Sequence, residues 1–338
     1  MRRSLVILLL LVLLGGYGVL ALVRSASPPG EAEPGQAGQA TERLVFYTTH
    51  GATTPQIPFW AAVRQGWPQG MALETRTWKD LDDLRGVVLA GKGDIWLGHI
   101  EGFAQAALRG APARLLAVTG WRKFYFLTDD PAVRDLTGLA AAVIRDEAPL
   151  AVTPPDSPAL GLLENIARHQ GPIFRLTRHA PRQLALEVLR GQVHHVLAPE
   201  PLVSMLLLKA PRLRVVAGLE AAHAQYCGGP DVQPIAGLAV HADLLQRRPE
   251  LVRDLLGRMQ AAAETLVDQP SEALAMLPPE VAGELGPEVL ANSMSRDLLR
   301  VTPAPQARRA VLDFLALVMP QGPGPGRAAL PEAFWARP

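Results

Sequence analysis

The chain has 338 residues, of which 49% are hydrophobic and 19% charged, so it can bury the core of two domains of ordinary size. Its formal net charge is +1 and no stretch concentrates basic residues, which argues against nucleic acid as a partner. Cys227 is the single cysteine, which excludes a disulfide or a thiolate metal site within the chain.

The N-terminus predicts export. Arg2 and Arg3 precede the apolar run Leu5–Leu14, which is the order of regions in a secretory signal. Residues 5–23 are also long enough to span a bilayer, so residues 1–25 are either a signal peptide or an uncleaved membrane anchor. Residues 26–43 are rich in Pro, Gly, Ala and Glu and predict a flexible linker. We therefore expect a periplasmic or otherwise extracytoplasmic protein, tethered to the membrane if the segment is not cleaved.

Residues 44–128 alternate between short apolar runs and helical patterns. The predicted strands are 44–48, 71–78, 94–98, 114–119 and 124–128. The predicted helices are 57–66, 80–91 and 103–108. Alternation with short loops predicts a parallel sheet whose crossover helices cover both faces.

The alternation restarts after the turn Asp135-Leu136-Thr137-Gly138. The predicted strands are 150–153, 174–177, 213–216 and 233–240. The predicted helices are 159–169, 182–189, 249–268, 270–276, 287–299 and 305–318. The C-terminal tail, 319–338, is rich in Pro and Gly, and we expect it on the surface, held by Phe334 and Trp335.

Two stretches in different halves of the chain share one pattern. Leu89–Leu108 and Leu189–Leu208 each read as a helix end, a glycine, a strand, a turn and a second helix. Such units predict two similar α/β lobes that face each other across a cleft, with ligand chemistry at the carboxyl ends of the strands.

Four stretches resemble the exported substrate-binding proteins of ABC importers, most closely the nitrate/sulfonate/taurine and thiamine-pyrimidine type. They are LAGKGDIWLGHIEGFAQAALRGAP at 89–112, DLTG at 135–138, LAPEPLVSMLL at 197–207 and RRPELVRDLLGRMQAAAETLVDQPSEAL at 247–274. The resemblance covers about residues 44–318. It implies an α/β, bilobed type II periplasmic-binding-protein fold, in which two parallel-dominated sheets flanked by helices surround a ligand cleft.

The resemblance also implies a domain organisation in which the chain crosses twice between the lobes. Residues 44–136 and the return segment 230–318 are then expected to form lobe 1, and residues 137–229 lobe 2, followed by the tail 319–338.

Four polar loops are candidates for ligand binding, because a ligand between two such lobes meets strand ends and helix N-termini from both. Their residues are His50, Thr53, Thr54, His99, Glu101, Asp156, Ser157 and Glu200. Each has an ordinary structural alternative. The hydroxyl groups and Asp156 can cap turns or helices, and Glu200 can lock the rigid turn between two prolines.

Trp78 and Trp121, at strand ends, can stack on a flat ligand or a cation, or pack in the core. We expect no metal site, because His194 and His195 are neighbours on a strand and point to opposite faces. The sequence also lacks the nucleophile-elbow, zinc-protease and phosphate-loop motifs. No catalytic residue and no cofactor are therefore expected.

The leading functional interpretation is a non-catalytic receptor that delivers a small molecule to an ABC permease in the membrane, as a monomer. An enzyme on the same fold, of pyrimidine or menaquinone type, is an alternative, although one cysteine cannot supply the cysteine-rich motif of the pyrimidine synthases. A membrane-tethered ligand sensor is a third possibility. Carboxylates at three loops (Glu101, Asp156 and Glu200) favour a neutral or cationic ligand, whereas Arg122 favours an anion.

Overall fold

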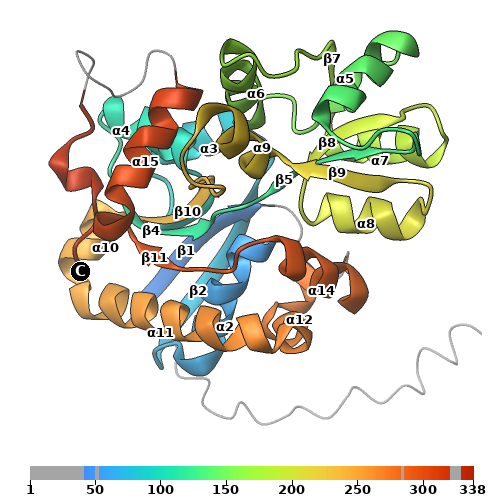
Figure 1. Cartoon of the computed structure of the whole chain (residues 1–338). Helices are drawn as coiled ribbons and strands as arrows, with labels where there is room; N and C mark the ends of the chain where they lie inside the picture. The colour runs from blue at the N-terminus through green and yellow to red at the C-terminus, as the bar shows by residue number, and fades with distance from the viewer. Residues whose placement is uncertain (1–41, 50–52, 283–284, 320–328) are drawn as a thin grey trace, which may run out of the picture. The chain divides into compact units, whose positions relative to one another are not determined.

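The structure, a computed structural model, describes residues 42–49, 53–282, 285–319 and 329–338. The expected signal or anchor, most of the linker and the candidate residue His50 lie outside these residues. Among the helices within them, none is long and apolar enough to cross a membrane. Two sheets flanked by helices organise the described chain, as the sequence predicted (Figure 1).

The first sheet has the strand order β11-β4-β10-β3-β1-β2. Its strands are β1 (Glu42–Thr49), β2 (Met71–Trp78), β3 (Ile95–His99), β4 (Ala113–Gly120), β10 (Ala236–His241) and β11 (Thr302–Pro303). Strands β1 to β4 run in one direction, whereas β10 and the short β11 pair antiparallel to their neighbours. Strand β10 is the one that returns from the other sheet, which accounts for its reversed direction.

Apolar side chains alternate between the two faces of the first sheet, as the pleat of a strand requires. Phe46 and Leu97 pack on one face, and Tyr47 and Trp96 on the other. The first face is covered by α2 (Ile57–Gly66), α10 (Ala242–Arg247), α11 (Pro249–Asp268), α12 (Ala273–Met276), α13 (Pro279–Ala282) and α14 (Pro287–Arg296). The second is covered by α3 (Leu81–Leu89), α4 (Ile100–Leu108) and α15 (Ala304–Val318).

The second sheet has the strand order β7-β6-β8-β5-β9, drawn in green and yellow in Figure 1. Its strands are β5 (Phe124–Thr128), β6 (Leu150–Val152), β7 (Leu176–Arg178), β8 (His195–Pro199) and β9 (Arg214–Gly218). All run in one direction except β5. One face carries α5 (Leu136–Arg145), α6 (Ala159–Arg168) and α9 (Leu219–Cys227), and the other α7 (Pro181–Leu189) and α8 (Leu202–Lys209).

The two stretches with a shared sequence pattern occupy equivalent places. They form β3 with α4 in the first sheet and β8 with α8 in the second, and both strands lie inside their sheets. Gly91 and Gly191, which precede the strands, have φ of +62° and +71°. This left-handed backbone conformation favours glycine and ends the preceding helix in both units.

The chain passes to the second sheet earlier than the expected boundary at residue 136. Strand β5 pairs with β8 and β9, so the passage lies between Gly120 and Phe124. The DLTG turn instead begins a helix, because the Asp135 side chain accepts a hydrogen bond from Gly138 N at 2.8 Å and caps α5. The chain returns between Cys227 and Ala236.

The described end of the tail, residues 329–338, is docked on the first sheet. Trp335 pairs with Leu115 of β4 in a parallel bridge, and Ala336 N donates to Leu115 O at 2.9 Å. Phe334 and Trp335 are both buried, and the Arg308 guanidinium lies 5.2 Å from the centroid of the Trp335 ring. These two aromatic residues hold the chain end by burial.

Candidate functional site

Polar and charged side chains from both sheets meet where the chain passes between them. Three follow the carboxyl ends of strands: β1 in the first sheet, and β8 and β9 in the second. Two others lie at the end of α14, and one lies between β4 and β5. We call these six residues the inter-lobe cluster: Thr54, Lys123, Glu200, Glu220, Arg296 and Asp297.

Glu220, in the first turn of α9, is fully buried. Its Oε1 accepts hydrogen bonds from the backbone N–H groups of Lys123 at 2.9 Å and Phe124 at 3.2 Å. Its Oε2 has no hydrogen-bond partner among the described residues. Burial raises the pKa of Glu220 to about 7, against the pull of these hydrogen bonds.

Glu200 is also buried and connects the two lobes. Its Oε2 accepts from Ser204 N at 3.1 Å in the first turn of α8, and its Oε1 lies 3.4 Å from Arg296 Nη1 on α14. Its backbone oxygen accepts from Lys123 Nζ at 3.1 Å. Burial raises the pKa of Glu200, although Ser204, Arg296 and Lys123 oppose the rise.

Asp297 follows α14 and is partly buried. Its Oδ2 accepts a hydrogen bond from Thr54 Oγ1, at the start of the turn after β1. Burial raises the pKa of Asp297 to about 8; the charge of Lys123 opposes the rise, and those of Glu200 and Glu220 increase it. Proximity to two other carboxyl groups thus adds to the effect of desolvation.

The backbone of α14 is fixed to the second sheet beside Asp297. Tyr125 Oη, on β5, donates to Arg296 O at 2.6 Å. Burial and the neighbouring carboxyl groups raise the pKa of Tyr125, so the phenol stays protonated and keeps this hydrogen bond. Arg296 Nη1 also donates to Ser204 Oγ at 3.0 Å. The cluster therefore holds elements of both sheets together.

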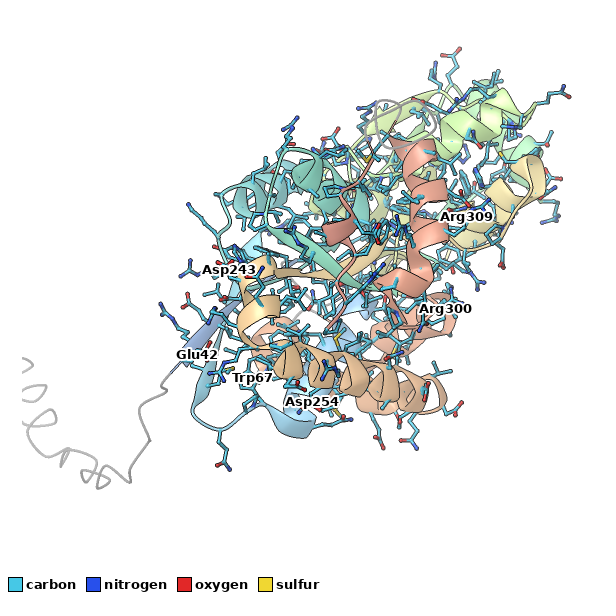
Figure 2. All side chains as sticks on the ribbon, turned by 90° about the vertical axis from the view of Figure 1, so that its left-hand side faces the viewer. Glu42, Trp67, Asp243, Asp254, Arg300 and Arg309 are labelled. Atoms are coloured by element: carbon cyan, nitrogen blue, oxygen red, sulfur yellow. The ribbon has the colours of Figure 1, made fainter. Side chains whose placement is uncertain are left out.

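The predicted candidates Thr54 and Glu200 belong to this cluster, and Trp121 lies next to it. The Trp121 ring is buried, and the Arg300 guanidinium lies 4.1 Å from the ring centroid. Figure 2 labels Arg300 in the segment between α14 and α15. Arg300 of the same chain therefore already stacks on the face that a ligand would use. Thr53 precedes the turn, and its backbone oxygen accepts from Gln56 N at 3.0 Å.

His99, Glu101 and Trp78 form a second, separate group around the end of β3. His99 Nδ1 lies 3.2 Å from Glu101 Oε1, and Glu101 is buried. Trp78 meets the His99 ring edge-on at 6.4 Å and donates from Nε1 to Leu97 O at 2.9 Å. Trp78 is also part of the apolar core on this face of the first sheet.

Asp156 and Ser157 lie in the turn after β6. Asp156 is exposed, and its carboxylate lies 3.7 Å from Arg178 Nη1. Ser157 is buried, and its Oγ has no partner among the described residues. Neither side chain caps α6, because Pro158 occupies the cap position and makes no side-chain cap bond.

Sequence reasoning missed four members of the cluster: Lys123, Glu220, Arg296 and Asp297. One signal for Glu220 was present, because an acidic residue follows the strand end in three places: Glu101 after β3, Glu200 after β8 and Glu220 after β9. Asp297 follows a helix rather than a strand and meets Thr54 from 243 positions away. No local pattern indicates such a contact. Among the described residues, no group of His, Cys, Asp and Glu is arranged to hold a metal ion.

Neither a protein-family model nor a curated protein matches this sequence. Solved structures do match the fold. A crystal structure of an ABC transporter from Parabacteroides distasonis superposes with a TM-score of 0.64 at 18% identity, covering 86% of this chain and 97% of that one.

Two further matches are named as binding proteins. The alkanesulfonate-binding protein from Xanthomonas axonopodis, bound to MOPS, has a TM-score of 0.58 at 15% identity and covers 87% of this chain and 96% of that one. The periplasmic nitrate-binding protein from Synechocystis has a TM-score of 0.55 at 16% identity, with 75% and 70% covered. This chain therefore has the bilobed α/β fold of the ABC-transporter binding proteins, as the four resembling stretches implied.

Proposed function

We propose that this protein is an exported, non-catalytic receptor of an ABC importer, which binds a small polar molecule between its lobes and delivers it to a permease. The inter-lobe cluster carries this proposal. Binding proteins of this fold close on a ligand like a hinge, so residues from both lobes must converge on it. Thr54 of the first lobe and Glu200 and Glu220 of the second do so here.

The cluster has the polarity of a ligand site rather than of a structural core. Buried carboxyl groups cost stability unless their charge is neutralised and their oxygens are hydrogen-bonded. Glu220 Oε2 lacks such a bond within the described chain, and burial raises the pKa of all three carboxyl groups. A bound solute offers the missing partners.

Proposed localisation follows from the N-terminal sequence. Residues 1–25 direct export, so the folded lobes act outside the cytoplasm, free or tethered by residues 26–43. Cell fractionation followed by N-terminal sequencing tests this. We expect the protein in the extracytoplasmic or membrane fraction, and full-length protein free in the cytosol would contradict it.

Receptor function is tested by small-angle scattering of the purified protein before and after its ligand is removed by partial unfolding and refolding. We expect the radius of gyration to rise when the ligand is removed and to fall again when the released molecules are added back. An identical radius in both states would argue against a receptor that closes on its ligand.

A further inference from the structure

The inter-lobe cluster contains more acids than bases. Glu200 and Glu220 are buried and Asp297 is partly buried, whereas the bases are the buried Lys123 and the partly buried Arg296. Arg122 also faces Glu220 and Asp297, but its guanidinium is paired with Asp231 at 3.0 Å. One acid is therefore left without a matching cation.

Two buried polar atoms on the helices that carry these acids, α9 and α14, have no partner among the described residues. One is Glu220 Oε2, on a side chain that the backbone of Lys123 and Phe124 holds in place through Oε1. The other is Ser293 Oγ, which is fully buried on α14. Ser293 lies one turn before Asp297, whose N–H donates to Ser293 O at 2.8 Å, so both residues share one face of the helix.

A carboxylate oxygen accepts hydrogen bonds, a hydroxyl oxygen can accept as well as donate them, and an unmatched acid attracts positive charge. An ammonium group supplies three N–H donors and one positive charge. The oxygens of an anion supply neither, and they would face three carboxyl groups.

We infer that the inter-lobe cluster binds the ammonium end of a small organic cation against Asp297 and Glu220, and that this cation takes the place of a proton. The inference rests on the proposed receptor function and names the ligand class of that site. It departs from the sulfonate- and nitrate-binding structures that share the fold.

The exchange of proton for cation follows from the surroundings of Asp297. Around Asp297 lie Thr54 in the turn after β1, Arg122 and Lys123 in the β4–β5 link, Tyr125 on β5, Glu200 in the turn between β8 and α8, Glu220 on α9, and its neighbour Arg296 on α14. Because its pKa is raised to about 8, Asp297 carries a proton at pH 7 in the protein without ligand. When the ammonium binds, that proton leaves for the solvent, and the carboxylate pairs with the cation. Thr54 Oγ1 keeps its hydrogen bond to the carboxylate throughout.

The test uses two ions of similar size and opposite charge, methylammonium and methanesulfonate, added to the ligand-free protein. Titration calorimetry in two buffers of different protonation enthalpy counts the protons exchanged. We expect methylammonium to bind with release of about one proton, and its affinity to rise about tenfold per pH unit from pH 6 to pH 8. An anion that bound here would show the opposite pH dependence.

Asp297→Asn is the test variant, and Asp254→Asn on the exposed face of α11 is the matched control (Figure 2). We expect Asp297→Asn to weaken methylammonium binding at least tenfold at pH 8 and to abolish proton release, and Asp254→Asn to behave as the parent protein. The proton count of the parent protein does not depend on whether Asp297→Asn folds.

Binding of methanesulfonate in place of methylammonium would overturn the inference and leave the receptor function intact. Binding of neither ion would also overturn it. The receptor function itself falls only if, in addition, the purified protein releases no small molecule when it is denatured.

Discussion

The apolar core of the first lobe and the buried acids of the inter-lobe cluster, Glu200 and Glu220, contribute to stability in opposite ways. In the core, the ring centroids of Phe46, Phe59 and Trp60 lie 4.0 to 5.4 Å apart. Their burial removes apolar surface from water, which stabilises the fold. In the cluster, burial disfavours the charged forms of Glu200 and Glu220, as their raised pKa values show.

The difference separates residues that packing alone accounts for from residues that the proposed ligand site accounts for. An apolar side chain in the core needs no explanation beyond packing. Three acids gathered at one point between the lobes lower the free energy of unfolding, and replacing such groups by apolar ones often stabilises a protein. Under the proposed receptor function, a bound solute accounts for their presence.

Phe46→Ala should have the largest effect on the core side of the comparison. Phe46 lies on β1 and is fully buried against Phe59 and Trp60 of α2, so the truncation leaves a cavity and should lower the free energy of unfolding by about 3–5 kcal/mol. Urea unfolding measures this. Val267→Ala on the exposed surface of α11 is the control and should change it by less than about 0.5 kcal/mol. A Phe46→Ala protein as stable as the parent would contradict this account of the core.

Lys123→Met should show the cost of unbalanced charge in the cluster. Lys123 is buried, and its Nζ donates to the backbone oxygen of Glu200. Its loss removes this hydrogen bond and a positive charge that favours ionised Glu200, and should lower the free energy of unfolding by about 3 kcal/mol at pH 7. Lys209→Met, at the exposed end of α8, is the matched control and should have little effect. Equal stability of the two variants would mean that the cluster is solvated and not buried.

Asp297→Asn should separate the cluster from the core by its pH dependence. An acid whose pKa is higher in the folded state holds a proton that the unfolded chain releases, so stability falls as pH rises from about 4 to about 8. Asparagine does not titrate. The free energy of unfolding of the variant, relative to that of the parent protein, should therefore rise by at least about 1 kcal/mol between pH 5 and pH 8. Thermal melts across this range measure the gain, and a constant difference would place the pKa of Asp297 near its ordinary value.

Arg309→Ala should have the smallest effect on the free energy of unfolding, because it removes an ion pair that is exposed to solvent. Arg309 lies on the surface of α15, where its guanidinium is 2.9 Å from the Asp313 carboxylate (Figure 2). An exposed pair of this kind contributes less than about 0.5 kcal/mol. Urea unfolding should therefore fail to distinguish the variant from the parent. A larger loss would show that charge pairs matter on the surface as they do in the cluster.

Much of the fold could be predicted from the sequence because local patterns of apolar and turn-forming residues indicate where strands and helices begin and end. The alternation of apolar runs and helices located the strands, and the glycines at 91 and 191 marked equivalent helix ends. The passage between the sheets was placed too late in the chain, because a strand pattern does not say which sheet β5 joins.

The candidate site was predicted in part for the same reason. Thr54 and Glu200 follow strand ends, where a parallel arrangement collects polar side chains, and they were found. Asp297 ends a helix and Lys123 lies in the link between the sheets. Their place in the cluster depends on how α14 packs against the second lobe, which long-range contacts determine and a local pattern does not record.

The most direct test of the central claim is mass spectrometry of the small molecules released when the purified protein is denatured, compared between the parent protein and Asp297→Asn. The account predicts about one molecule of a small organic cation per chain from the parent protein and much less from the variant. Equal amounts from both proteins, or an anion such as a sulfonate from either, would contradict it.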